Sequence, residues 1–362
     1  MSVVTPTRPP VRVLVVDDSA FMRTALTRMI ASEPGLEVIG TASNGLEALA
    51  RIPELDPDVV TLDLEMPGLD GFETLRRIMT QFPRPVIMVS SVSDRDAEIT
   101  FNALAAGAFD YIPKQLSNNS LDIIHLRSDL VAKIRAAANS APSPLLDKLT
   151  RKPVQSSAAL PTPASLPTPS IVTIGTSTGG PKALQEILPL LPRDLPVPVL
   201  IVQHMPAGFT APFAQRLNTL CAITVCEAVH RDVLRPGVVY IAPAGKHLKV
   251  ERLSESRTII CLDSHPENYL HIPSVDIMMS SVAEAFRNHA LGVIMTGMGA
   301  DGAEGMKDIY RAGGLTIGQD EASCTVYGMP RACAELNVLS RVVPLSQIPA
   351  QILQATRYRK RA

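Results

Sequence analysis

The sequence has little net charge, no long apolar run and no pair of cysteines in C-x-x-C spacing. Its formal net charge is −1, so it lacks the basic excess typical of proteins that bind nucleic acid. No apolar run approaches the ~20 residues that span a bilayer, and residues 1–10 show no signal-peptide pattern. The five cysteines lack C-x-x-C spacing, which argues against a zinc or disulfide framework. We therefore expect a reduced, cytoplasmic protein that is not inserted in a membrane and binds no nucleic acid.

Glycine is also absent from residues 108–174, and proline is enriched in the second half of that stretch. Seven of the 31 prolines fall in residues 141–170, together with many Ser, Thr and Ala residues. This composition is typical of an extended, semi-rigid linker. The sequence therefore predicts two domains, at residues 11–140 and 170–358, joined by a Pro-rich linker at residues 141–169.

Short apolar strands and amphipathic helices alternate five times within residues 11–140. The expected strands are Val11–Val16, Leu36–Ala42, Val59–Leu64, Pro85–Ser90 and Phe109–Pro113. Helical patterns lie between them, and a last helix is expected at Leu121–Ala138. This alternation predicts an α/β domain with a doubly wound parallel sheet, in which functional sites form at the carboxyl ends of the strands.

Polar and acidic side chains stand at the ends of these expected strands. They are Asp17, Asp18, Asp63, Ser90 and Lys114. Carboxylates that converge on one edge of a sheet repel one another, and a divalent cation relieves the repulsion. Ligation by oxygen atoms alone suits Mg²⁺. For one acidic pair, helix capping by Asp18 or Ser19 is the alternative, but the whole set favours a cation and phosphate site.

These motifs resemble those of the two-component receiver domain, which has a flavodoxin-like fold, over all of residues 11–140. The resemblance implies that Asp63 is the phospho-acceptor. It implies that Mg²⁺ binds Asp18 directly and Asp17 through water, together with Asp63 and the backbone carbonyl of Glu65. The implied switch residues are Ser90, Tyr111 and Lys114, with Ser91 as an alternative to Ser90.

The second domain begins with residues 170–181, which read S-I-V-T-I-G-T-S-T-G-G-P. This pattern predicts a buried strand, a glycine-rich turn and a helix. Ser177 lies in the turn, beside backbone N–H groups at a helix N-terminus, which suits a serine nucleophile with an oxyanion site. A phosphate-binding loop and a purely structural turn are the alternatives.

Strands and helices continue to alternate after this turn. The expected strands are Val197–Val202, Val238–Ile241, Thr258–Leu262, Leu291–Met295 and Leu315–Gly318. Residues 234–262 have closely spaced strands without helices, which predicts an antiparallel hairpin added to a Rossmann-like parallel sheet. No compact all-helical module follows the linker, which argues against a DNA-binding helix-turn-helix output.

A serine nucleophile needs a base and a group that orients the base. His204 follows an apolar strand in Q-H-M-P, and Asp301 follows another strand in T-G-M-G-A-D-G. All three groups are therefore expected at one edge of the sheet. The order serine, aspartate, histidine would instead need, for example, Asp263 with His271 or His289, which are more easily read as surface or helix residues.

The motifs G-T-S-T-G-G, Q-H-M-P and T-G-M-G-A-D-G, in this order after a receiver and a linker, resemble the catalytic domain of chemotaxis protein-glutamate methylesterases of the CheB type. The resemblance spans nearly the whole chain. It implies that Ser177 is the nucleophile, His204 the base and Asp301 the residue that orients the base, with no cofactor for the ester chemistry. Thr178 and the backbone N–H of Met298 are the candidates for oxyanion support.

The family resemblance implies an enzyme that removes γ-glutamyl methyl esters from methyl-accepting chemoreceptors and releases methanol. It also implies deamidation of receptor glutamines. The receiver is expected to cover the catalytic mouth until a chemotaxis sensor histidine kinase phosphorylates Asp63. Two alternatives stay open. One is a non-enzymatic signalling adaptor whose glycine turns bind a nucleotide or phosphate, and the other is a hydrolase that acts on a different ester or amide.

Overall fold

The computed structural model describes residues 9–91, 93–114, 120–140, 167–254, 257–266 and 269–359, without the side chains of residues 94, 95, 120–123 and 125. The chain divides into two compact units, Met1–Ser156 and Ser157–Ala362. Residues 141–166 of the expected linker lie outside the described residues. No helix in the described part combines the length and apolar character that a membrane crossing requires.

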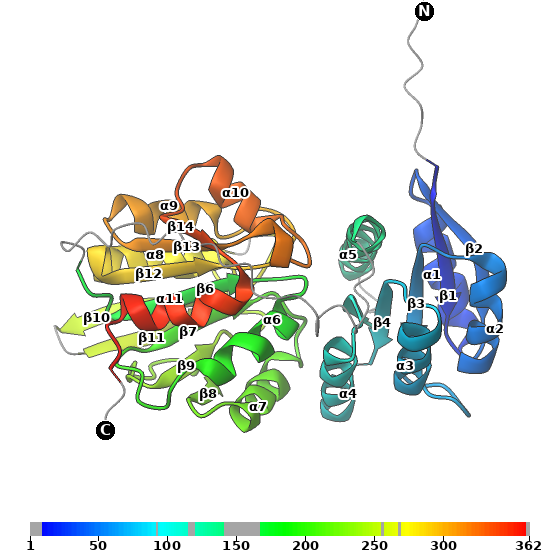
Figure 1. Ribbon diagram of the computed structural model, residues 1–362, viewed down its shortest axis with the longest axis horizontal. Helices are drawn as coiled ribbons and strands as arrows, with labels where there is room; N and C mark the ends of the chain where they lie inside the picture. Colours follow the sequence, from blue (N-terminus) through cyan, green and yellow to red (C-terminus); the bar gives the residue numbers. More distant parts are fainter. Residues whose placement is uncertain are drawn as a thin grey trace, which may run out of the picture. The chain divides into compact units, whose positions relative to one another are not determined.

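The first unit is a five-stranded parallel sheet with flanking helices, in the strand order β2-β1-β3-β4-β5 (Figure 1). Helix α1 packs beside α5, whereas α2 packs on α3 and α3 on α4. The strands are β1 (Val11–Val16), β2 (Leu36–Ala42), β3 (Val59–Asp63), β4 (Val86–Ser90) and β5 (Asp110–Pro113). The helices are α1 (Ala20–Ala31), α2 (Gly45–Leu55), α3 (Gly71–Gln81), α4 (Asp94–Ala105) and α5 (Ser120–Asn139).

Each helix from α1 to α4 begins directly after a loop at the carboxyl end of a strand. A polar side chain caps each of these helices by accepting a hydrogen bond from a backbone N–H in the first turn. The capping residues are Ser19, Asn44, Asp70 and Ser93. At α1 the cap is Ser19 rather than Asp18, so the exposed Asp18 side chain is not used to begin the helix.

The second unit contains a seven-stranded parallel sheet in the order β14-β13-β12-β6-β7-β9-β8 and a separate two-stranded sheet, β10-β11. The large sheet consists of β6 (Ile171–Thr176), β7 (Val199–Gln203), β8 (Thr224–Glu227), β9 (Val238–Ile241), β12 (Ala290–Ile294), β13 (Leu315–Gln319) and β14 (Arg341–Val343). The antiparallel pair is β10 (His247–Ser254) and β11 (Arg257–Asp263). The helices are α6 (Gly180–Ile187), α7 (Thr210–Leu220), α8 (Val275–Phe286), α9 (Ala303–Arg311), α10 (Met329–Glu335) and α11 (Ile348–Ala355).

The strand order of the large sheet reverses around β6, which lies between β7 and β12 (Figure 1). From β6 the chain first builds β7, β8 and β9 on one side, and it later returns to build β12, β13 and β14 on the other. Ligands of open parallel sheets bind beyond the carboxyl ends of the strands at such a reversal. The residues that follow β6, β7 and β12 therefore meet at the natural site of this fold.

The structure confirms the expected fold class, two α/β units with parallel sheets and an antiparallel hairpin in the second. It adds β8, β14 and α10, which the sequence did not indicate. The two strands are only four and three residues long and are partly exposed. Since they lie at the two edges of the sheet, they lack the continuous apolar run that marks a central strand.

Candidate active site and phosphorylation site

The bend after β6 holds Ser177 against the segment that follows β12. Its backbone N–H donates to Thr296 O at 3.0 Å, and its carbonyl accepts from Gly180 N at 2.8 Å. Gly297 packs directly on it, since a Cβ atom built at Gly297 would lie 2.9 Å from Ser177 Cβ. Gly179 has a φ of +77°, which favours glycine. The turn is therefore fixed by close backbone packing on both sides of the serine.

His204 stands next to Ser177 because of the strand register. Thr176 of β6 is paired with Gln203 of β7, so Ser177 and His204 are the residues that directly follow this pair. His204 Nε2 lies 2.8 Å from Asp301 Oδ2. The other ring nitrogen, Nδ1, is buried and has no hydrogen-bond partner in the described part of the chain. The structure thus leaves one imidazole nitrogen available for a proton from a serine.

The carboxylate of Asp301 is surrounded by donors from the start of α8. Ser274 Oγ donates to Oδ1 at 2.8 Å, Val275 N to Oδ2 at 2.8 Å and Asp276 N to Oδ1 at 3.0 Å. Burial by itself raises the pKa of Asp301, but the His204 ring and these backbone N–H groups outweigh it and hold the pKa well below its usual range. Asp301 is therefore ionised at neutral pH and orients the His204 ring.

The structure corrects the expectation for His271. The sequence suggested a surface or helix residue, but His271 lies in a loop with its ring stacked on the His204 ring, with centroids 4.0 Å apart. Asp263 is bound elsewhere, to Lys249 Nζ at 3.0 Å, and His289 Nδ1 contacts Thr168 O at 3.0 Å. The alternative serine, aspartate, histidine order therefore has no support in these contacts.

A pocket of about 570 Å³ opens beside the Asp301 carboxylate. Its lining mixes apolar and acidic side chains and includes Leu270, His271, Met298, Asp301, Glu335 and Leu336. The pocket therefore adjoins Asp301 and the ring of His271 that stacks on His204, whereas Ser177 and His204 do not line it.

Two backbone N–H groups near Ser177 are free to bind an oxyanion. Within the described residues, no hydrogen bond engages the N–H of Thr178 or that of Met298. The N–H of Ser177 itself is not available, because it donates to Thr296 O. The geometry is thus compatible with the expected oxyanion role for Thr178 through its backbone rather than its buried side chain.

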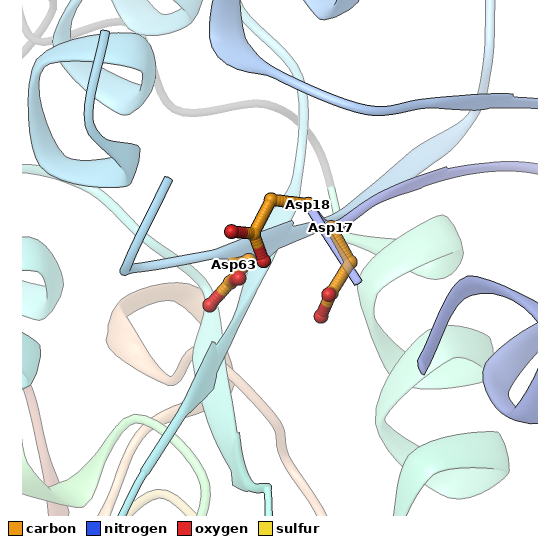
Figure 2. A group of neighbouring side chains, drawn as sticks. All are labelled: Asp17, Asp18 and Asp63. Carbon is orange, nitrogen blue, oxygen red and sulfur yellow. The ribbon is translucent and has the colours of Figure 1, made fainter. Parts of the chain in front are cut away.

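Three aspartates converge in the first unit (Figure 2). They are Asp17 and Asp18 after β1 and Asp63 at the end of β3, and one carboxylate oxygen from each lies within 4.8 Å of the others. Lys114 Nζ is 2.6 Å from Asp63 Oδ2 and 3.4 Å from Asp17 Oδ2. The structure therefore brings together the predicted phospho-acceptor, the predicted lysine and the carboxylates of the predicted cation site.

The environment of these carboxylates fits a divalent cation. Burial raises the pKa of Asp17, and burial together with the Asp17 charge raises that of Asp63 to about 6, although Lys114 opposes both shifts. Asp17 Oδ2 is buried without a hydrogen bond in the described part of the chain. Glu65 donates its N–H to Asp63 Oδ1 at 3.1 Å and lines an open pocket of about 460 Å³ with Asp18. A buried carboxylate oxygen that has, among the described residues, only Lys114 Nζ at 3.4 Å, next to an open pocket lined by Asp18 and Glu65, suits a hard cation.

The two candidates for the switch hydroxyl lie at the end of β4. Ser90 is fully buried, and its Oγ accepts from Thr100 Oγ1 at 2.8 Å. Ser91 Oγ instead donates to Asp96, inside the capping loop of α4. Tyr111 on β5 is buried as well, with its ring 5.4 Å from Lys133 Nζ. Ser90 Oγ also donates to Ser91 O at 3.1 Å, so both hydroxyls are engaged and Ser90 stays the predicted switch residue with Ser91 as the alternative.

Three residues that the sequence did not assign to the site have clear places in it. Ser274 holds Asp301, and Thr296 receives the Ser177 N–H. Gln203 donates through Nε2 to Ser177 O at 3.0 Å and to His204 O at 2.9 Å. The only sequence signal for Gln203 is its place before the histidine in Q-H-M-P, and Thr296 stands in T-G-M-G in the same way.

Comparison with known families and proteins agrees with this geometry. A family model described as CheB methylesterase matches residues 172–352, and one described as response regulator receiver domain matches residues 13–124. The crystal structure of the Thermotoga maritima CheB methylesterase catalytic domain superimposes with a TM-score of 0.50 at 37% sequence identity, over 52% of this chain and 99% of that chain.

Curated relatives match nearly the whole length. A protein-glutamate methylesterase/protein-glutamine glutaminase from Oleidesulfovibrio alaskensis is 44% identical over 95% of this chain and 99% of its own. One of the same name from Pyrococcus abyssi is 43% identical over 95% of this chain and 93% of its own. The chain therefore belongs to the CheB methylesterase family of chemotaxis response regulators, which are hydrolases with a receiver domain.

Proposed function

We propose that this chain is a phosphorylation-regulated serine esterase that hydrolyses glutamate γ-methyl esters on methyl-accepting chemoreceptors. The same chemistry deamidates receptor glutamines, because an amide and a methyl ester pass through similar tetrahedral intermediates. The role of the enzyme is adaptation in chemotaxis or a related chemosensory pathway. It acts in the cytoplasm, where the receptor helices and the sensor histidine kinase present the substrate and the phosphoryl group.

The placement of His204 is the observation that carries the proposal. Its Nε2 is bound to the ionised Asp301, and its Nδ1 is buried without a hydrogen-bond partner in the described part of the chain. His204 and Ser177 directly follow the paired strand residues Gln203 and Thr176. A base held by a carboxylate and adjacent to a serine hydroxyl is the arrangement of serine hydrolases. Membership of the CheB methylesterase family supports a methyl ester of a protein glutamate as the substrate class.

The reaction proceeds in two steps. Ser177 Oγ attacks the ester carbonyl while its proton passes to His204 Nδ1, and the oxyanion is bound by the N–H groups of Thr178 and Met298. The tetrahedral intermediate then collapses, and the imidazolium gives its proton to the departing methanol. Water, deprotonated by His204, attacks the acyl-enzyme, and the glutamate carboxylate leaves with Ser177 reprotonated. Asp301 stabilises the imidazolium in both steps.

The first unit supplies the regulation. Asp63 accepts the phosphoryl group, and Lys114 pairs with it. The carboxylates of Asp17, Asp18 and Asp63 and the carbonyl of Glu65 would hold Mg²⁺, which would supply positive charge next to the phosphoryl group. Ser90 donates a hydrogen bond to the same phosphoryl group. Tyr111, the switch aromatic, changes its packing in response to phosphorylation. Phosphorylation then shifts the two units away from an inhibited arrangement.

The first test is methanol release from methylated receptor membranes. Wild type and Ser177→Ala are compared, each with and without Mg²⁺ and a small-molecule phosphodonor such as acetyl phosphate. We expect release by the wild type, stimulation by the phosphodonor and loss of release in Ser177→Ala. Because the mutant lacks only the hydroxyl, its receiver still takes up the phosphoryl group, and that uptake is the control for folding.

Other outcomes would point to the alternatives. Methanol release by Ser177→Ala at the wild-type rate would show that Ser177 is not the nucleophile. Specific binding of receptor membranes without turnover, unaffected by His204→Ala, would favour a signalling adaptor. Turnover of simple esters such as p-nitrophenyl acetate, without release from receptor membranes, would favour a hydrolase with another substrate.

A further inference from the structure

Gln203 is a buried polar residue that the ester mechanism described above does not use. It closes β7, and only 2% of its surface is exposed. Its side-chain amide donates to two carbonyl oxygens, Ser177 O at 3.0 Å and His204 O at 2.9 Å. One amide group therefore ties the carbonyl of the nucleophile to the carbonyl of the base.

The hydrogen bond to Ser177 O also fixes the direction of an oxyanion donor. The carbonyl of Ser177 and the N–H of Thr178 belong to the same peptide group. A trans peptide is planar, so its C=O and N–H point in opposite directions. Gly180 N at 2.8 Å and Gln203 Nε2 at 3.0 Å hold the carbonyl from one side. The Thr178 N–H is consequently aimed away from Gln203 and stays unbonded in the described part of the chain.

The second oxyanion donor is fixed by the same geometry but with different groups. The N–H of Met298 shares its peptide with the carbonyl of Gly297, which accepts from Gly328 N at 3.0 Å and Met329 N at 2.9 Å. Backbone donors alone therefore orient this peptide. The peptide between Ser177 and Thr178 differs because one of the two donors to its carbonyl, Gln203 Nε2, belongs to a side chain. A side-chain substitution can therefore remove this hydrogen bond and leave the backbone donor in place.

The shape of the turn allows Gln203 to reach this position. A Cβ atom at Gly180 would lie 2.0 Å from Gln203 Oε1 and 2.4 Å from Thr176 Oγ1. Glycine at this position thus leaves the space that the glutamine amide occupies. A reversed amide would direct Oε1 at two carbonyl oxygens, so the observed orientation, with Nε2 toward the carbonyls, is the one that the surroundings select.

We propose that Gln203 is a positioning residue that aims the Thr178 N–H at the oxyanion and keeps the Ser177 and His204 loops in register. This inference rests on the proposed function, because it assigns Gln203 to the ester hydrolysis described there. Gln203 acts through Ser177, Thr178 and His204 and does not touch the substrate. Its effect belongs to the transition state, where the oxyanion forms, and not to substrate binding.

The decisive variant is Gln203→Met, which keeps nearly the same length and volume but has no N–H to donate. Loss of one oxyanion-hole donor costs roughly 10²- to 10³-fold in kcat, and a donor that is misdirected rather than removed costs less. We therefore expect kcat for methanol release to fall about 10- to 100-fold, with KM changed less than about threefold. The rate at which a fluorophosphonate probe labels Ser177 should fall in parallel.

The matched control is Thr316→Val. Thr316 is fully buried on β13, and its Oγ1 donates to Val338 O at 2.7 Å and accepts from Ser340 N at 2.9 Å. Its substitution also removes a buried donor and should lower the stability of the second unit to a comparable degree. Because Thr316 contacts neither oxyanion peptide, kcat and the labelling rate should stay within about twofold of the wild type.

The results separate this inference from the proposed function. If the wild type releases methanol and Gln203→Met matches it in kcat, the positioning role is wrong and the proposed function stands. If the wild type releases no methanol, the proposed function fails. If Gln203→Met does not fold, Gln203→Asn decides: it keeps the amide but is one methylene too short to reach Ser177 O. A low kcat in a folded Gln203→Asn supports the role, and a wild-type kcat overturns it.

Discussion

The acidic edge of the first unit, with Asp63, and the serine edge of the second, with Asp301, occupy equivalent places in their sheets. The pKa values of these two carboxylates are nevertheless shifted in opposite directions. Both lie at the carboxyl ends of central parallel strands, β1 and β3 in one unit and β6, β7 and β12 in the other. Asp63 and Asp301 are both shielded from water. Burial raises the pKa of Asp63 to about 6, whereas the pKa of Asp301 lies below its usual range.

The number of donors explains the difference. Asp301 accepts from two backbone N–H groups, a serine hydroxyl and an imidazole. Asp63 accepts from one backbone N–H and from Lys114, which it shares with the buried carboxylate of Asp17. The fixed donors therefore keep Asp301 ionised, whereas Asp63 has too few donors to compensate for its burial. The second situation suits a residue that is to receive a cation and a phosphoryl group.

The largest expected effect comes from removing the charge that these donors stabilise. Asp301→Asn should lower kcat for methanol release by about 10³- to 10⁴-fold, because a neutral amide neither stabilises the imidazolium nor selects the reactive tautomer of His204. The measurement is methanol release from methylated receptor membranes. Phosphoryl uptake by Asp63 serves as the control and should be unchanged. An Asp301→Asn enzyme within tenfold of the wild type would refute the role of this pair.

The matching change at the other edge should remove regulation and spare catalysis. Asp63→Asn cannot form the acyl phosphate, so the ratio of methanol release with phosphodonor to that without it should fall to about 1. The rate without phosphodonor should stay within about twofold of the wild type, since Asp63 belongs to the other compact unit. Stimulation that persists in Asp63→Asn would place the phospho-acceptor elsewhere.

The sequence predicted those parts of the fold that are fixed by local pattern. β1 and β6 are rich in β-branched residues and are buried throughout most of their length, and their position follows from this local pattern. The short strand β14 (Arg341–Val343) is half exposed and carries no such pattern, so only its pairing with β13 reveals it. Regular burial is visible in a sequence, whereas edge pairing is not.

The site shows the same division. Strand-end placement was enough to select Ser177, His204 and Asp301 as a group, and the structure brings His204 and Asp301 into contact. The contacts of Gln203 and His271 with the site could not be predicted in this way. Gln203 depends on the register of β6 and β7 and on the direction of one peptide group. His271 lies in an irregular loop, and only tertiary packing puts its ring on His204.

A smaller effect concerns stability in the absence of Mg²⁺. Asp63 has a pKa near 6 in the folded state against 3.8 for a free carboxyl, so the folded chain holds this proton more tightly. Its contribution to the unfolding free energy therefore falls as the pH rises from about 4 to about 6. The pH dependence that Asp301 gives to stability has the opposite sign, because its pKa is lowered on folding. Its stabilising contribution is lost only as the pH falls below 3.8.

Asp63→Asn should consequently stabilise the first unit at pH 7.5 with EDTA, by about 1–2 kcal/mol once partial solvent screening is allowed for. At pH 4.5 the difference from the wild type should be smaller, because Asp63 is then largely protonated. Denaturant titration of the full-length wild type and variant at both pH values provides the measurement. Destabilisation of the variant at pH 7.5 would show that the Lys114 contact outweighs the cost of burying the charge.

The smallest effect is expected for a carboxylate that has donors and is open to water. Glu73 on α3 pairs with Arg76 at 3.3 Å and with Arg77 at 3.1 Å, and 38% of its side chain is exposed. Water solvates this charge in the folded and unfolded chain alike, so Glu73→Gln should change the free energy of unfolding by less than about 0.5 kcal/mol. The same denaturant titrations measure it. A change as large as that of Asp63→Asn would mean that ion pairing, rather than burial without enough donors, sets the energy of the acidic edge.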